Sequence, residues 1–258
     1  MTTTEIHIIW TELCHDIGVA VEVADKWWTT IVNKYTEDQR HYHTLDHIAD
    51  MCVFYNNWKQ RLRNSSAVAL AIFFHDIVYD PKSSSNEQDS IQMFRDFAHE
   101  AELLPKSCLL HSCPPTKPQT GIMHDPKSSS NEQDSIQMFR DFAHEAELDA
   151  YLKDAAIQLI DATITHVAVD NTDLKFFLDF DMAVLGRPAE GYSNYASQIQ
   201  REYGHLDNAT FNSKRSQVLQ NFLARDHIFS TEEFTQLYEG KARSNMAKEI
   251  TLLQSQST

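Results

Sequence analysis

The chain has 258 residues, of which 42% are hydrophobic and 23% charged, as is typical of a globular protein with one large domain or two small ones. Its net charge of −15 argues against nucleic-acid polymers and anionic membranes as partners, because both attract basic surfaces. No run approaches the roughly 18–20 apolar residues of a membrane span, and the N-terminus lacks a secretory signal, so we expect a cytoplasmic protein.

Helical periodicity runs through almost the whole chain. Only 6 Gly and 7 Pro are present, and apolar residues recur every three or four positions, which favours helices over a many-turned β architecture. We expect no strand, and helices over 4–18, 21–36, 47–62, 66–76, 85–103, 130–148, 150–166, 173–185, 191–204, 208–226 and 231–255. The segment 66–76 is apolar nearly all round, which predicts a central helix. The expected fold class is all-α.

One block of the sequence occurs twice: residues 80–103 and 125–148 both read DPKSSSNEQDSIQMFRDFAHEAEL. Solenoid repeats diverge and need more units, so a recent tandem duplication, an alternative exon or a faulty gene model explains the identity better. The Pro-rich segment 104–124 between the copies predicts an irregular loop. We therefore expect a single domain over 1–258 with an insertion at about 104–148. Either copy could fill the one native position; we favour the first, with the other as an extra surface helix.

The dipeptide His75-Asp76 closes the apolar run 67–74. Burying an ionised carboxylate without a partner is strongly unfavourable, so such groups form ion pairs, accept hydrogen bonds or bind a metal. Imidazole nitrogen and carboxylate oxygen are both ligands of divalent metals. The dipeptide therefore predicts a metal site, provided that further ligands exist elsewhere in the chain.

The same dipeptide occurs at His15-Asp16 and at His124-Asp125, in less informative settings. The first lies on the polar side of an amphipathic helix, and the second is created where the duplicated blocks join. We interpret both as structural or solvated. The cysteines, including Cys108 and Cys113, form no recognised zinc spacing and are expected to be free thiols.

Further candidate ligands lie on both sides of His75-Asp76. Upstream, His43 and His47 are four residues apart and would share one face of a helix. Downstream, Asp179 and Asp181 lie in an apolar helical segment, where an unpaired carboxylate would be unfavourable.

The order His47, His75-Asp76, Asp181 resembles the H…HD…D signature of the HD-domain metal-dependent phosphohydrolases. The segments YHTLDHIADM, FFHDIVYDP, SNEQDS, DATITH and FLDFDMAVLG are similar to the predicted metal-dependent HD phosphohydrolase subgroup. The resemblance extends from about residue 10 to residue 203, apart from the insertion, which is absent from the family pattern.

This resemblance implies an HD-domain-like helical bundle with a buried divalent metal ion, which could be Mn, Mg, Fe, Co, Ni or Zn. It assigns four metal ligands: His47, His75, Asp76 and Asp181. The family pattern, which reads DxDxxxLG in this sequence, points to Asp181 as the last ligand, with Asp179 as the alternative.

Four residues are candidates for catalysis: Asp76, Asp80, His43 and His166. Asp76 or Asp80 could position the attacking water, although Asp80 could equally be the turn residue before a proline. The two histidines could bind phosphate, protonate a leaving group or hold a second metal; a helix-capping or structural role is their alternative. Glu87 is a weaker candidate, because a capping box over 84–87 already explains it.

The expected function is hydrolysis of a nucleotide or another small phosphate ester by metal-activated water. The alternatives are a di-iron oxygenase on the same scaffold, with His43 and His166 as additional ligands, and a catalytically inactive binding protein. Arg40, Lys82 and Arg201 are the basic residues nearest the motifs, and we interpret each as a solvated surface charge.

Overall fold

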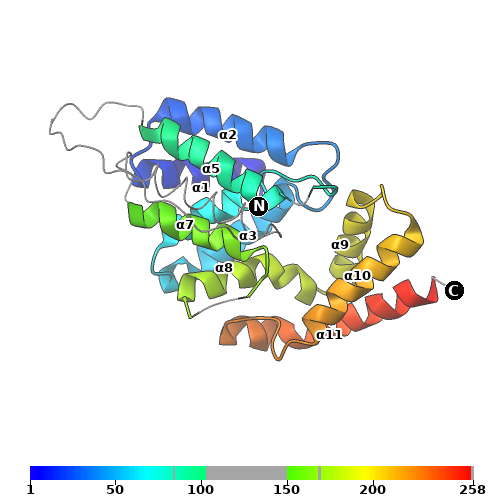
Figure 1. The fold of residues 1–258 in the computed structure, drawn as a ribbon. Coiled ribbons are helices and arrows are strands. Elements are labelled where there is room, and N and C mark those ends of the chain that lie inside the picture. The colour runs from blue at the N-terminus through cyan, green and yellow to red at the C-terminus, as the bar shows by residue number, and fades with distance from the viewer. Residues whose placement is uncertain (84, 103–149, 168–169, 257–258) are drawn as a thin grey trace, which may run out of the picture.

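The computed structural model describes residues 1–83, 85–102, 150–167 and 170–256, and within these ranges the chain is all-α, as its periodicity predicts (Figure 1). The expected helix 130–148 lies outside the described residues. The α-helices are α1 (Thr3–Asp16), α2 (Val21–Tyr35), α3 (Leu45–Trp58), α4 (Ser65–Phe74), α5 (Asn86–Glu102), α7 (Ala150–Ala162), α8 (Thr172–Met182), α9 (Ala189–Glu202), α10 (Asn208–Leu223) and α11 (Glu232–Ser255), with short 3-10 helices η1 (Lys59–Arg61) and η2 (Ala183–Gly186).

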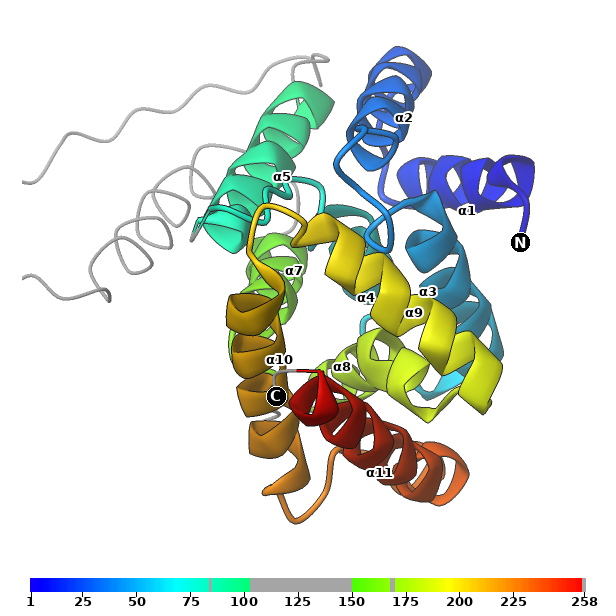
Figure 2. The same cartoon turned by 90° about the vertical axis from the view of Figure 1, so that its right-hand side faces the viewer.

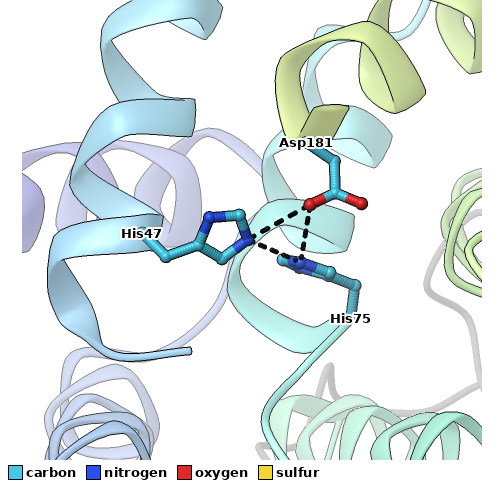
Figure 3. A group of neighbouring side chains, drawn as sticks. All are labelled: His47, His75 and Asp181. Carbon is cyan, nitrogen blue, oxygen red and sulfur yellow. Dashed lines mark hydrogen bonds and ion pairs between the residues drawn. The ribbon is translucent and has the colours of Figure 1, made fainter. Parts of the chain in front are cut away.

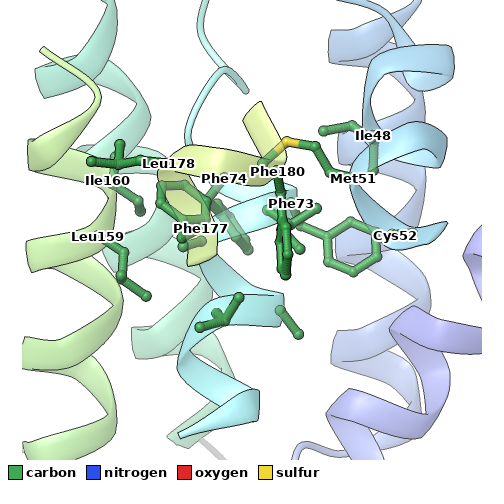
Figure 4. Packing of buried hydrophobic residues seen from close by; sticks show 14 of the residues in the cluster. Ile48, Met51, Cys52, Phe73, Phe74, Leu159, Ile160, Phe177, Leu178 and Phe180 are labelled. Carbon is green, nitrogen blue, oxygen red and sulfur yellow. The ribbon is translucent and has the colours of Figure 1, made fainter. Parts of the chain in front are cut away.

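Helix α4 is the central helix that the apolar run predicts, and it contacts α3, α5, α7 and α8. Figure 4 shows Phe73 and Phe74 of α4 among side chains of α3, α7 and α8. Every residue from Ala67 to Phe74 is buried, and burial of each large side chain contributes about 1.5–3 kcal/mol. The helix ends at Phe74, two residues earlier than expected, and the carbonyl of Asp76 beyond it accepts a hydrogen bond from Arg40. His75 and Asp76 therefore lie at and after the C-cap.

The first copy of the duplicated block forms α5 and packs into the core. Phe94 and Phe97 are almost fully buried. The Phe97 ring lies 5.2 Å from Trp10 of α1, 5.6 Å from Trp27 of α2 and 5.4 Å from Phe74 of α4, measured between ring centroids. Aromatic packing thus joins α5 to three other helices.

The C-terminal helices α9, α10 and α11 gather on one side of the bundle that α1 to α5, α7 and α8 form (Figures 1 and 2). Gly186, the predicted helix end, closes η2 where it meets α11. A Cβ atom there would lie 2.6 Å from the Cβ of Tyr238, so this close approach requires glycine. Asn245 of α11 donates hydrogen bonds to the carbonyls of Leu185 and Arg187, both at 2.9 Å.

Candidate metal centre

Three side chains from separate parts of the fold converge on one point (Figure 3). His47 lies in the first turn of α3, His75 is the C-cap of α4, and Asp181 is near the end of α8. The Nε2 atoms of the two histidines are 3.2 Å apart, and Asp181 Oδ1 is 3.3 Å from His47 Nε2. One ligand atom from each residue lies within 4.8 Å of the others, so the group could hold a metal ion.

Asp76, the fourth predicted ligand, borders this group. Its Oδ2 atom lies 3.1 Å from His75 Nε2 and 3.8 Å from His47 Nε2. The Asp76 side chain is 20% exposed, whereas those of His47 and His75 are 2% and 1% exposed. The group is therefore accessible from the side of Asp76. Coordination by Asp76 itself stays a prediction.

Hydrogen-bond chemistry shows that these residues suit a cation. His75 Nδ1 lies 3.1 Å from the Ile72 carbonyl, which can only accept, so Nδ1 carries a hydrogen. In neutral His75, Nε2 then presents a lone pair beside Oδ2 of Asp76 and, at 3.9 Å, Oδ1 of Asp181. Neutral His47 can supply at most one hydrogen to these acceptors. A positive charge, on a metal ion or a proton, satisfies such a donor set.

The neighbouring carboxylates also favour a positive charge on His75. Burial lowers the pKa of His75, but the charge and hydrogen bond of Asp76 and the charge of Asp181 outweigh burial and raise this pKa to about 9. Burial alone would raise the pKa of Asp181, yet hydrogen bonds from His166 and His47 hold it well below its usual range. The local electrostatic field therefore attracts cations.

His166 contacts Asp181 from a turn rather than from a helix. Helix α7 ends at Ala162, not at 166 as expected, and His166 has a left-handed φ of 49° that no helix interior accepts. Its Nε2 lies 2.9 Å from Asp181 Oδ2. Arg225 donates to the backbone carbonyls of His166 and Thr165, at 2.7 and 3.0 Å, and so supports this conformation.

His43 contacts Asp76, the other carboxylate. Its Nε2 is 3.9 Å from Asp76 Oδ2, and its Nδ1 is 2.7 Å from Glu202 Oε2. Burial lowers the pKa of His43, but the charges of Asp76 and Glu202 prevail and raise it. Both additional histidines of the sequence analysis are thus adjacent to the metal group, one at each carboxylate.

Arg40 is a buried internal clamp, which corrects its interpretation as a solvated surface charge. Arg40 is only 5% exposed. The guanidinium donates to the carbonyls of His43, Asp76 and Ile77 at 3.0, 2.7 and 2.8 Å. Arg40 therefore joins the segment that carries His43 to the turn that carries Asp76, and its remaining donor, Nε, contacts the Glu37 carboxylate at 3.4 Å.

The two aspartates of α8 have different neighbours. Asp179 accepts hydrogen bonds from the backbone N–H groups of Ser230 and Thr231 at 2.7 and 2.8 Å, and from the Thr231 hydroxyl at 2.6 Å. These residues immediately precede α11, so Asp179 anchors the start of that helix. Asp181 is the residue that joins the histidines, as the family pattern suggests.

Asp80 is placed in the turn after His75-Asp76. One of its carboxylate oxygens accepts the Lys82 N–H at 2.9 Å, and its own N–H donates to Asn86 at 2.8 Å. These contacts fit the turn role, and a catalytic role for Asp80 stays a prediction. Glu87 lies in the first turn of α5, and Ser84, its expected capping partner, lies outside the described residues.

The pair His15-Asp16 is not part of this centre. The side chains of His15 and Asp16 are 88% and 73% exposed, as a solvated pair should be. The pair His124-Asp125 lies outside the described residues, as do Cys108 and Cys113. Two other cysteines, Cys14 and Cys52, are buried free thiols, in agreement with expectation.

Glu202 is a neighbour of the centre that the sequence analysis missed. It is the last residue of α9 and is 5% exposed. It follows Tyr192, Tyr195 and Ile199 at helical spacing on the buried stripe, and a carboxylate on such a stripe is a readable signal. Its sequence neighbour Arg201 is exposed, as a solvated surface charge should be.

The chain matches none of the protein-family models, curated proteins or solved structures with which it was compared. Among the described residues, no helix is both long and apolar enough to span a membrane. The fold and the geometry thus establish an all-helical protein, over the described ranges, with a buried His47, His75 and Asp181 group that could hold a metal ion.

Proposed function

We propose that the protein is a metal-dependent phosphohydrolase of the HD type that acts on a nucleotide or another small phosphate ester. The observation that carries this proposal is the position of the His75 ring. Its Nδ1 faces the Ile72 carbonyl, and its Nε2 lies 3.1 and 3.9 Å from the carboxylates of Asp76 and Asp181 and 3.2 Å from His47 Nε2. The H…HD…D order of the sequence motifs supports the reaction class.

In this proposal His47, His75, Asp76 and Asp181 hold a divalent metal ion, of which Mn, Mg, Fe, Co, Ni and Zn are candidates. The ion, when bound, would lower the pKa of a water molecule and neutralise charge on a phosphoryl oxygen. A divalent cation also explains how a chain of net charge −15 attracts an anionic substrate.

The partly exposed side chains of the centre suggest how a substrate would be bound. The side chains of Asp76, His43 and His166 are 20%, 19% and 24% exposed, whereas His47 and His75 are almost fully buried. The exposed three therefore lie where solvent reaches the group. In this proposal Asp76 would orient the attacking water, and the two histidines would bind phosphoryl oxygens or give a proton to the leaving group.

A di-iron oxygenase is the second candidate function. It is favoured by one observation: His43 and His166 place an additional imidazole beside each carboxylate of the group. Two metal ions per chain and no phosphate release would support this candidate. A catalytically inactive binding protein is the third, and it predicts metal or ligand binding without turnover.

Metal analysis of the purified protein, combined with phosphate release from a panel of nucleotides in Mn²⁺ or Mg²⁺, tests the proposal. We expect about one ion per chain and metal-dependent phosphate release. Asp181→Asn should lower metal retention at least tenfold and abolish turnover, because it removes a ligand charge while preserving shape. Asp46→Asn, which changes an exposed carboxylate beside His47, is the matched control and should behave as the parent.

Stability supplies an independent measurement. Mn²⁺ that binds the folded chain should raise its Tm, with about 2.7 kcal/mol gained at a hundredfold excess over Kd. The increase should be lost in Asp181→Asn and kept in Asp46→Asn. Equal metal content and equal phosphate release in all three proteins would show that the proposed centre is wrong.

A further inference from the structure

Glu202 has no role in the proposed function, yet its carboxylate makes more hydrogen bonds than the other carboxylates near the centre. One oxygen, Oε1, accepts the backbone N–H groups of His41, Tyr42 and His43 at 2.7, 2.7 and 3.0 Å. The other, Oε2, contacts the Tyr79 hydroxyl at 3.0 Å and His43 Nδ1 at 2.7 Å. The Glu202 side chain has no exposed surface.

These contacts fix the hydrogen on the His43 ring. A buried carboxylate with several donors is ionised, and the pKa of Glu202 is about 2: burial raises it, but the hydrogen bond and charge of His43 and the backbone N–H groups outweigh burial. An ionised carboxylate can only accept. His43 Nδ1 must therefore carry the hydrogen, in the neutral ring as well as in the charged one.

The orientation of the ring is fixed as well. The His43 ring stacks on the Tyr79 ring at 4.2 Å between centroids and 30° between planes. Tyr79 in turn donates to Glu202, the same carboxylate that contacts His43 Nδ1. His43 Nε2 is then the atom that faces Asp76 Oδ2, at 3.9 Å, and the His43 side chain is 19% exposed.

We propose that Glu202 is a positioning residue that fixes His43 as the Nδ1–H form, so that Nε2 alone exchanges a proton with the substrate. This inference rests on the proposed function and assigns the leaving-group proton to one atom. In hydrolysis the bond from water oxygen to phosphorus forms and the ester P–O bond breaks. His43 Nε2 gives its proton to the departing oxygen, and the proton lost by the attacking water passes to solvent, from which Nε2 regains one.

The variant Glu202→Gln separates positioning from simple structural support. A glutamine has nearly the same shape, and its carbonyl oxygen can still accept the backbone N–H groups. Its amide nitrogen, however, would donate to His43 Nδ1 and force the ring hydrogen onto Nε2. Glu190→Gln, at an exposed position in the first turn of the same helix, is the matched control.

The first measurement needs no activity. Nitrogen NMR of histidine-labelled, metal-free protein, recorded at a pH above the raised pKa of His43, reports the tautomer of the neutral ring, with the His43 signal assigned by its loss in His43→Gln. We expect the Nδ1–H form in the parent and in Glu190→Gln, and the Nε2–H form in Glu202→Gln. An Nδ1–H form in Glu202→Gln would overturn the inference.

The second measurement compares two phosphate monoesters in Mn²⁺. Phenyl phosphate has a poor leaving group that needs a proton, whereas p-nitrophenyl phosphate has a good one that needs it less. Glu202→Gln should lower kcat for phenyl phosphate by about 10²–10⁴-fold, lower kcat for p-nitrophenyl phosphate much less, and leave KM nearly unchanged. It should cost nothing further in a His43→Gln background.

The outcomes separate this inference from the proposed function. An equal loss on both esters would mean that Glu202 is only structural, and the inference would fail. A parent with the Nδ1–H form of His43 but with no phosphate release from either ester would instead overturn the proposed function, and with it the catalytic role of Nε2.

Discussion

Arg40 joins two parts of the centre that are far apart in the sequence. Its guanidinium binds the carbonyl of His43 on one segment and those of Asp76 and Ile77 on another. It also lies over the ring of Tyr35, 4.9 Å from the centroid, so the charge is packed as well as hydrogen-bonded. Such a buried cation sets the distance between the two segments rather than the affinity for an anion.

Arg40→Met should therefore damage both stability and metal binding. The substitution keeps an unbranched apolar side chain but leaves three carbonyls without a donor, at a cost of about 3 kcal/mol. Urea unfolding should show this loss, and metal titration should show weaker binding because Asp76 is no longer held. Arg201→Met, at the exposed arginine on α9, should change the free energy of unfolding by no more than about 0.5 kcal/mol. Equal effects of the two variants would contradict the clamp.

The surroundings of a residue, not its neighbours in the sequence, set its chemistry here. His15-Asp16 and His75-Asp76 are the same dipeptide, but the side chain of His15 is 88% exposed and that of His75 is 1% exposed. The second carboxylate beside buried His75 stabilises a positive charge on its imidazole. At His15, water surrounds the ring and the neighbouring carboxylate instead.

The two aspartates of helix α8 point to opposite sides of the helix and have different neighbours. Successive residues in an α-helix are rotated by about 100°, so positions two apart point to nearly opposite sides. Asp181 therefore faces the histidines while Asp179 faces the start of α11. Burial raises the pKa of Asp179 to about 6, although the hydrogen bonds from Thr231 and Ser230 oppose this rise.

Asp179→Ala should destabilise the protein and spare the metal site. Its loss leaves the N–H groups of Ser230 and Thr231 without their acceptor, at an expected cost of about 2–3 kcal/mol in the free energy of unfolding. Metal content measured below the unfolding transition should equal that of the parent. The opposite pattern, with metal lost and stability kept, is expected of Asp181→Asn. If Asp179→Ala showed that pattern instead, the ligand role would belong to Asp179.

For the molecule as a whole, the duplicated block raises the question of which copy the core uses. The first copy forms α5 and inserts Phe97 among aromatic residues of α1, α2 and α4. The second copy has the same sequence and lies outside the described residues. Matched substitutions at identical positions can therefore compare the two copies without any difference in local sequence.

Phe97→Ala should cost about 3–5 kcal/mol of folding free energy, because it leaves a cavity in a fully buried position. The matched variant Phe142→Ala changes the same position of the second copy. We expect thermal or urea unfolding to show a clearly larger loss for Phe97→Ala. A larger loss for Phe142→Ala would assign the core position to the second copy.

Much of this architecture is readable from the amino-acid order. The apolar period predicts the helices of the described residues to within a few positions, and the continuous run before His75 predicts the central helix α4. Local spacing suffices for these features because helix formation and helix burial depend on residues three and four apart. The order of His47, His75 and Asp181 likewise anticipates the group that the fold brings together.

Other features depend on contacts between segments that are remote in the sequence. Glu202 meets the N–H group of His41 across 161 positions, and Arg40 reaches Ile77 across 37. The left-handed turn at His166 is supported by Arg225, 59 positions away. A pattern of three or four residues contains no information about such partners. Only the folded chain decides which buried charge is a ligand, which is a clamp and which orients a histidine, because each role is set by the atoms that surround the charge.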